Sequence, residues 1–301
     1  MKEKKSLDKP IIIVGFGRSG TSIISDIILS HSKLGITSNY NLKYPRSIYI
    51  NLLRNFFDNE LFYIQGQKNQ LNSVSILNKY TFRNVEAYRF WENLTGFDLG
   101  RNFLNETDVP IERLNYVREQ LVKLLIFQRK ERLGFKITGP SRLRFFNQIF
   151  PDAYYIYVKR DPVANIKSFI EVDFNRYRKN NLWWKGKGVY TDEEINFVAQ
   201  NQNQPELIAA LQYYKVGIYH NIEANKFNMQ SRIIDINYED FVENPNEEIL
   251  KITDFVELTL DKRIKKFLMK NPIYNRNVTS VNYFSNDVEQ NVRRIANNGI
   301  S

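Results

Sequence analysis

The 301-residue chain contains no cysteine and only two histidines. Without thiols it can form neither a disulfide nor a thiolate zinc site, and it has no cysteine nucleophile. Two histidines exclude a histidine-rich metal centre. The first apolar run, Ile11–Val14, ends at Gly15 and is too short for a signal-peptide core or a membrane span. We therefore expect a cytoplasmic protein that uses no metal.

Lysine and arginine outnumber the acidic residues by 43 to 33, which gives a net charge of +10. Such a surplus favours an anionic ligand, a nucleic acid or an anionic membrane surface, and charge alone does not choose among them. Hydrophobic residues make up 43% of the chain and charged residues 25%, so the composition is that of a globular protein.

Apolar runs and helical spacings alternate along the chain. Between the runs, apolar residues recur at intervals of three and four, as in Ile23–Ile28, Leu114–Leu125 and Leu207–Ile218. Strands that alternate with helices predict an α/β fold, a single domain with a central, mostly parallel sheet flanked by helices. The expected strands are Ile11–Val14, Leu133–Ile137, Tyr154–Val158 and Ile233–Ile236.

The octapeptide GFGRSGTS at residues 15–22 joins the first strand to the first helix. Gly15 and Gly20 have the G-x-x-x-x-G spacing of a phosphate loop, in which backbone N–H groups and a helix N-terminus bind an anion. Arg18 adds a fixed positive charge. Thr21 stands where a P-loop ATPase has its lysine, which argues against ATP or GTP hydrolysis. A purely structural glycine turn is the alternative interpretation.

A second basic junction, VKRDPVANIKS, occupies residues 158–168. Arg160 follows a strand, Pro162 suits the first turn of a helix, and Ser168 lies about two turns further on. Ligands of open α/β sheets bind at the carboxyl ends of the strands, so Arg160 and Ser168 could form a second phosphate site. Taken alone, a helix-capping salt bridge explains this junction equally well.

Together, the two junctions resemble the nucleotide-binding signatures of sulfotransferases that depend on 3′-phosphoadenosine 5′-phosphosulfate (PAPS). The resemblance implies a P-loop-like sulfotransferase fold with PAPS as the donor. It also implies that Arg160 and Ser168 bind the 3′-phosphate, and that the first loop binds the 5′-phosphosulfate. The loop residues concerned are Gly17, Arg18, Ser19, Gly20, Thr21 and Ser22.

Further segments carry the same resemblance, from about Pro10 to Leu258. FPDA at residues 150–153 and NYEDF at residues 237–241 are similar to family segments, and the second adds Tyr238 to the nucleotide-binding residues. His31 lies where the family often has a histidine at the end of its first helix. Bacterial members have stretches that resemble VEAYRFW at residues 85–91, Lys136 with Arg142, and the pair Trp183–Trp184.

Sulfuryl transfer requires stabilisation of the leaving oxygen and a base for the acceptor proton. By analogy with phosphoryl transfer, the leaving oxygen would be stabilised by Arg18, the loop N–H groups and the hydroxyls of Thr21 and Ser22. The bacterial motif implies Glu86 as the base; Glu92 is its nearest competitor, and an exposed carboxylate is the alternative for Glu86. Lys136 could contact the sulfuryl group or the acceptor, or be an ordinary surface lysine. Protein-tyrosine sulfotransferases carry their glutamate near the position of Asn39, so tyrosine sulfation is not supported.

Several other residues have two interpretations. His31 and His220 lack partners nearby in the sequence, and a structural role is the simpler one. Trp183 and Trp184 could line an acceptor pocket or pack in the core. Lys262–Lys266 forms a basic helix face, which is either ordinary surface or a contact for an anionic acceptor or membrane.

The sequence thus predicts a tail at residues 1–9 and one domain at residues 10–301. Within it, residues 37–108 would form an irregular acceptor-side segment, and residues 271–301 a tail that closes the nucleotide site. The predicted activity is transfer of a sulfuryl group from PAPS to a hydroxyl or amine of a glycan, lipid or small metabolite. The alternatives are a P-loop-type kinase, a basic nucleic-acid-binding protein without a recognised motif, and a catalytically silent member of the fold.

Overall fold

The computed structural model describes residues 7–58, 80–177, 182–270, 273–275, 277 and 284–300, with side chains 172–177 and 270 excepted. Its five strands are β1 (Ile11–Gly15), β2 (Leu34–Ile36), β3 (Arg132–Lys136), β4 (Tyr154–Lys159) and β5 (Ile233–Asn237). The helices are α1 (Thr21–Ile28), α2 (Asn39–Lys43), η1 (Ile48–Leu53), α3 (Arg54–Phe57), α4 (Tyr88–Thr95), α5 (Ile111–Gln128), α6 (Leu143–Ile149), α7 (Pro162–Tyr177), α8 (Asp192–Gln200), α9 (Pro205–Lys226), η3 (Gln230–Arg232), α10 (Tyr238–Glu243), α11 (Pro245–Phe255), α12 (Lys262–Lys270) and α13 (Asn286–Asn298).

The strands form one parallel sheet in the order β2-β3-β1-β4-β5. The predicted α/β class and all four predicted strands are confirmed, with ends that differ by one residue. The sequence reading missed β2, because three residues around Gly35 give no recognisable run. Since β1 lies at the centre, the loop at residues 15–22 emerges between its neighbours β3 and β4.

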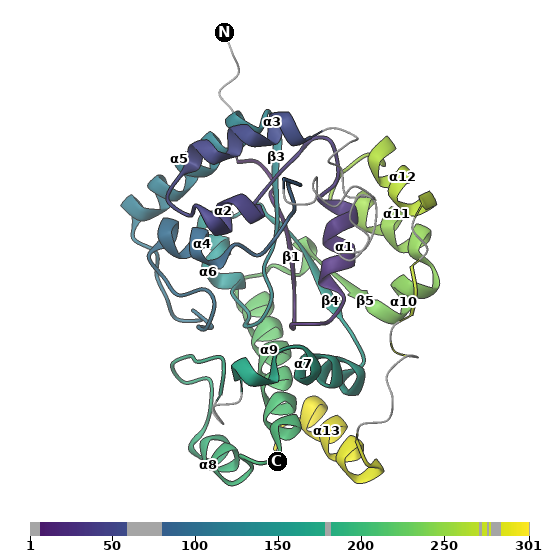
Figure 1. Ribbon diagram of the computed structural model, residues 1–301. Coiled ribbons are helices and arrows are strands. Elements are labelled where there is room, and N and C mark those ends of the chain that lie inside the picture. The colour runs from purple at the N-terminus through teal and green to yellow at the C-terminus, as the bar shows by residue number, and fades with distance from the viewer. Residues whose placement is uncertain are drawn as a thin grey trace.

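Alternate residues of each strand point to opposite faces of the sheet, and each face has its own core. Ile12, Phe135 and Tyr155 pack on one face with helices α4, α5 and α6. Ile11 and Ile13 pack on the other face with α1, α11 and α12. Figure 1 shows these two groups of helices to the left and right of the sheet. A buried strand with both faces covered requires apolar residues throughout, which explains the run at Ile11–Val14.

A third cluster packs helices α7, α8, α9 and α13 below the sheet, in the lower part of Figure 1. Phe16 and Trp184 belong to it, so the phosphate loop is anchored in this cluster by its own aromatic side chain. The predicted irregular segment at residues 37–108 contains the short helices α2, η1, α3 and α4 in its described part. Its residues 59–79 lie outside the described residues, as do residues 1–6 of the predicted tail and most of residues 271–283.

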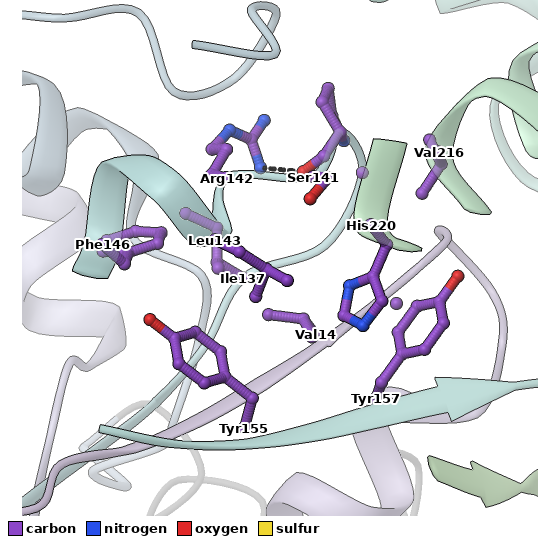
Figure 2. Close-up of a pocket in the computed structure, with 13 residues that line it drawn as sticks. Val14, Ile137, Ser141, Arg142, Leu143, Phe146, Tyr155, Tyr157, Val216 and His220 are labelled. Carbon is purple, nitrogen blue, oxygen red and sulfur yellow. Dashed lines mark hydrogen bonds between the residues drawn. The ribbon is translucent and has the colours of Figure 1, made fainter. Parts of the chain in front are cut away.

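His220 of α9 lies in the core against the sheet. Figure 2 shows its ring facing the ring of Tyr157, and the two stacked rings have centroids 3.7 Å apart. Both residues line a small cavity of about 10 Å³. Burial lowers the pKa of His220 to about 4, because the charged imidazolium would lose its hydration. His31 is also buried, and its Nε2 lies 2.9 Å from the carbonyl oxygen of Thr259.

The buried His220 predicts a pH-dependent stability. Between pH 6.5 and about 4 the unfolded chain binds a proton at this residue and the folded chain does not, so stability falls as the pH is lowered through this window. The loss should be on the order of 3 kcal/mol. Urea unfolding from pH 7 to pH 4 should give a shallower pH dependence for His220→Phe, which keeps a ring but cannot titrate. Identical pH dependence in the two proteins would contradict this assignment.

Candidate active site

The loop at residues 15–22 turns sharply at the carboxyl end of β1. Gly20 has a φ of 95°, and a Cβ atom there would lie 2.2 Å from Cδ2 of Tyr238, so only glycine fits against that ring. Arg18 also has a left-handed φ of 71°. The hydroxyl of Ser19 is buried and has no hydrogen-bond partner among the described residues. An unpaired hydroxyl beside the N-terminus of α1 is suited to an anion.

Arg160 lies directly after β4, beside this loop. Its Nη1 donates to the carbonyl oxygen of Arg18 at 2.9 Å, and its guanidinium lies 4.8 Å from the ring centroid of Tyr238. Nε of Arg18 in turn donates to the hydroxyl of Ser168 on α7 at 3.2 Å. The structure therefore brings together Arg18, Arg160, Ser168 and Tyr238, which come from three separate segments of the chain.

Burial lowers the pKa of the Arg160 guanidinium, since the folded chain holds this cation away from water. Its Nε and Nη2 donate to Oδ1 of Asn277 at 2.9 and 2.6 Å. Nδ2 of Asn277 donates to Glu239 at 2.7 Å. Sequence reasoning missed Asn277 and Glu239. Neither has a spacing signal that links it to Arg160, because the contacts join segments that are distant in the chain.

Lys136 ends β3 on the other side of the loop, and it is 9% exposed rather than a surface lysine. Its Nζ donates to the hydroxyl of Ser22 at 3.0 Å and lies 3.7 Å from Oε1 of Glu86. Thr138 donates its hydroxyl to the same Oε1 at 2.8 Å. Lys136 thus connects the phosphate loop with the carboxylate that the sequence singled out, and Thr138 is a polar neighbour that sequence reasoning missed.

A cavity of about 930 Å³ opens beside Lys136 and Glu86. Gly17 and Ser22 line it, so it reaches the loop at residues 15–22. Its wall also includes Trp183, over which the Arg101 guanidinium lies at 4.9 Å. The remaining lining residues are Asp26, Leu42, Arg83, Asn84, Val85, Ala87, Tyr88, Arg89, Glu92, Gly96, Phe97, Asp98, Gly100, Thr138, Phe169 and Trp184.

Two further residues that the sequence singled out, Glu92 and Trp184, also line this cavity. Glu92 lines the same cavity and accepts a hydrogen bond from the Gly100 N–H; burial and the nearby Asp98 raise its pKa. Trp184 is 4% exposed and packs edge-on against Phe16, so it serves the core as well as the cavity wall.

Arg142 fastens one wall of the cavity. Its guanidinium donates to the carbonyl oxygens of Leu99, Asn102, Thr138 and Pro140. Burial lowers the pKa of this arginine to about 10. These bonds join the loop at residues 99–102 to the loop that follows β3, so both keep one arrangement around the cavity.

Several solved sulfotransferase structures are similar to this chain. The structure of sulfotransferase STF9 from Mycobacterium avium superposes with a TM-score of 0.51 and 14% identity, over 87% of this chain and 67% of that one. The sulfotransferase domain of the Synechococcus PCC 7002 olefin synthase gives 0.44 and 16%, over 98% and 96%. Mouse sulfotransferase SULT7A1, complexed with PAP, gives 0.40 and 13%, over 95% and 82%.

No curated protein sequence matches the chain. Within the part of the chain that the structure describes, no helix combines the length and the apolar character that a bilayer crossing requires. The profile described as "Sulfotransferase family" matches residues 10–262 of the 301 residues. The P-loop-like fold that the sequence predicts is confirmed, and the chain belongs to the sulfotransferase family.

Proposed function

We propose that this sulfotransferase moves a sulfuryl group from PAPS to a hydroxyl group of an acceptor bound in the 930 Å³ cavity. The observation that carries the proposal is the chain of contacts at one sheet edge. Arg160 and Ser168 meet the phosphate loop at Arg18, and Lys136 joins the other side of that loop to Glu86 at the cavity. A donor with two anionic ends and an acceptor with a proton to lose would find matching groups there.

The residues at the two junctions fit such a donor. The Ser19 hydroxyl lacks a protein partner among the described residues, and the backbone turn at Gly20 leaves no room for a side chain. Arg160 is a partly desolvated cation that an added phosphate would stabilise. When bound, PAPS supplies an activated sulfuryl group on a phosphate oxygen. Arg160 and Ser168 would hold its 3′-phosphate, while the loop and Arg18 would hold its 5′ end.

In the proposed reaction, the acceptor oxygen bonds to sulfur while the bond between sulfur and the phosphate oxygen breaks. The electron pair of that bond stays on the phosphate oxygen, and the acceptor proton goes to Glu86. Lys136 and Ser22, whose side chains touch, would stabilise the charge that develops between donor and acceptor. Glu86 suits the role of base better than Glu92, because Lys136 connects it directly to the loop.

The first test is nucleotide selectivity. Isothermal titration calorimetry should give tight binding of adenosine 3′,5′-bisphosphate (PAP) and weak binding of ATP with Mg²⁺, since Thr21 stands in place of the Walker lysine. Transfer of labelled sulfate from PAPS to cell-extract acceptors should persist in EDTA. A strict Mg²⁺ requirement, restored when the ion is added back, would instead indicate a kinase.

The second test concerns Arg160. Arg160→Ala should weaken PAP binding by about 10- to 150-fold, the range for a lost hydrogen bond to a charged group of roughly 1.5–3 kcal/mol. Binding of adenosine 5′-phosphate should change far less. Arg232→Ala is the matched control, because Arg232 bonds to Ala153 at the opposite end of the sheet. An equal loss for both nucleotides would remove the 3′-phosphate assignment.

The third test concerns the base. Glu86→Gln keeps the size of the side chain but accepts no proton, so it should slow transfer by roughly 10²–10⁴-fold with PAP affinity nearly unchanged. Glu92→Gln should do much less. The measurement is single-turnover release of labelled sulfate from PAPS with water as the acceptor. A normal rate for Glu86→Gln would contradict the assignment of Glu86 as the base, but it would not contradict the proposed sulfuryl transfer.

A further inference from the structure

Thr138 lies two residues beyond Lys136, where the chain leaves β3, and it lines the large cavity. Its hydroxyl is 2.8 Å from Oε1 of Glu86. An ionised carboxylate can only accept hydrogen bonds, so the threonine is the donor. A hydrogen bond to a charged acceptor is shorter and stronger than one between neutral groups, and it fixes the direction of the carboxylate.

The backbone of Thr138 is itself held by two donors. The Tyr88 hydroxyl donates to the Thr138 carbonyl oxygen at 2.8 Å, and Nη1 of Arg142 donates to it at 3.2 Å. Burial raises the pKa of Tyr88, so this hydroxyl keeps its proton and remains a donor. These two hydrogen bonds fix the backbone from which the Thr138 side chain reaches Glu86.

Glu86 and Tyr88 flank Ala87, which has a left-handed φ of 49° and precedes the first turn of α4. One residue of this turn reaches the Thr138 hydroxyl and the other reaches the Thr138 carbonyl. The turn is thus joined to the end of β3 at two points. This double attachment sets the distance between the Glu86 carboxylate and the phosphate loop.

Lys136 alone would not orient the carboxylate. Its Nζ lies 3.7 Å from Oε1, beyond hydrogen-bond length, whereas it lies 3.0 Å from the Ser22 hydroxyl. Lys136 and Thr138 both approach Oε1 of Glu86, and no hydrogen bond among the described residues involves Oε2. One oxygen is therefore held by the protein, and the other is left for a ligand proton.

We infer that Thr138 is a positioning residue, which holds Oε1 of Glu86 so that Oε2 takes the acceptor proton. This inference rests on the proposed sulfuryl transfer and on Glu86 as its base. Thr138 contacts no reacting atom in this assignment; it acts through Glu86, and Tyr88 and Arg142 act through Thr138. The hydroxyl group, rather than the volume of the side chain, is the feature that matters.

The test compares Thr138→Val with Thr138→Ser. Valine has the shape of threonine without its hydroxyl, and serine restores the hydroxyl. In single-turnover release of labelled sulfate from PAPS with water as the acceptor, Thr138→Val should be about tenfold slower than the unchanged protein. Thr138→Ser should lie within about threefold of it. PAP affinity measured by calorimetry should stay within about twofold for both variants. Thr138→Ala serves in place of valine if that variant does not fold.

Two controls separate positioning from a general loss of structure. Thr253→Val removes another buried threonine hydroxyl, on α11 and bonded only to Leu250 among the described residues, and should leave the rate unchanged. Adding Thr138→Val to Glu86→Gln should slow the reaction no further, because the two residues act as one unit.

The inference would be overturned by a normal rate for Thr138→Val, by a serine variant as slow as the valine variant, or by a full tenfold loss on top of Glu86→Gln. Failure of the unchanged protein to bind PAP or to release sulfate from PAPS would instead overturn the proposed function. The two failures are therefore distinguishable.

Discussion

The parallel pairing of β1 with β3 and with β4 places the phosphate loop, Lys136 and Arg160 at one edge of the sheet. Ile13 pairs with Lys136 and Gly15 pairs with Val158, so the three strands end at the same edge of the sheet. The phosphate loop, Lys136 and Arg160 leave the sheet within one or two residues of these pairs. A shift in register by one residue would turn each of these side chains to the other face and separate them.

The same edge concentrates partly buried charge. Lys136, Arg142 and Arg160 are each less than a tenth exposed, and each is met by oxygen atoms of the chain. Arg142 is satisfied by backbone carbonyls alone, which makes it part of the scaffold. Arg160 has amide and backbone carbonyl partners, and Lys136 has hydroxyl and carboxylate partners, so an added anionic group would find two cations already in place beside the loop.

The sequence predicted the fold and named residues of the two strand-to-helix junctions more fully than residues around the large cavity. The apolar run Ile11–Val14 and the glycine spacing of the loop are patterns of neighbouring residues, and such patterns can be recognised in a single sequence. Lys136 was recognised only by resemblance, and its burial beside Ser22 could not be read from its neighbours in the chain. The sequence did not indicate a role for Thr138, because that role depends on its contact with Glu86, which lies 52 residues earlier in the chain. β2 was missed because three residues are too few to show a period.

Tyr238 has a consequence for how this site can change during evolution. The Arg160 guanidinium lies over the Tyr238 ring. Gly20 also packs against this ring, and a Cβ atom at Gly20 would lie 2.2 Å from it. A larger residue at position 20 is tolerated only if position 238 loses its ring, and the ring cannot be lost without removing the surface on which Arg160 rests. A replacement at only one of the two positions, 20 or 238, would damage the site. Positions 20 and 238 are therefore expected to vary together, or not at all, among chains that keep this loop.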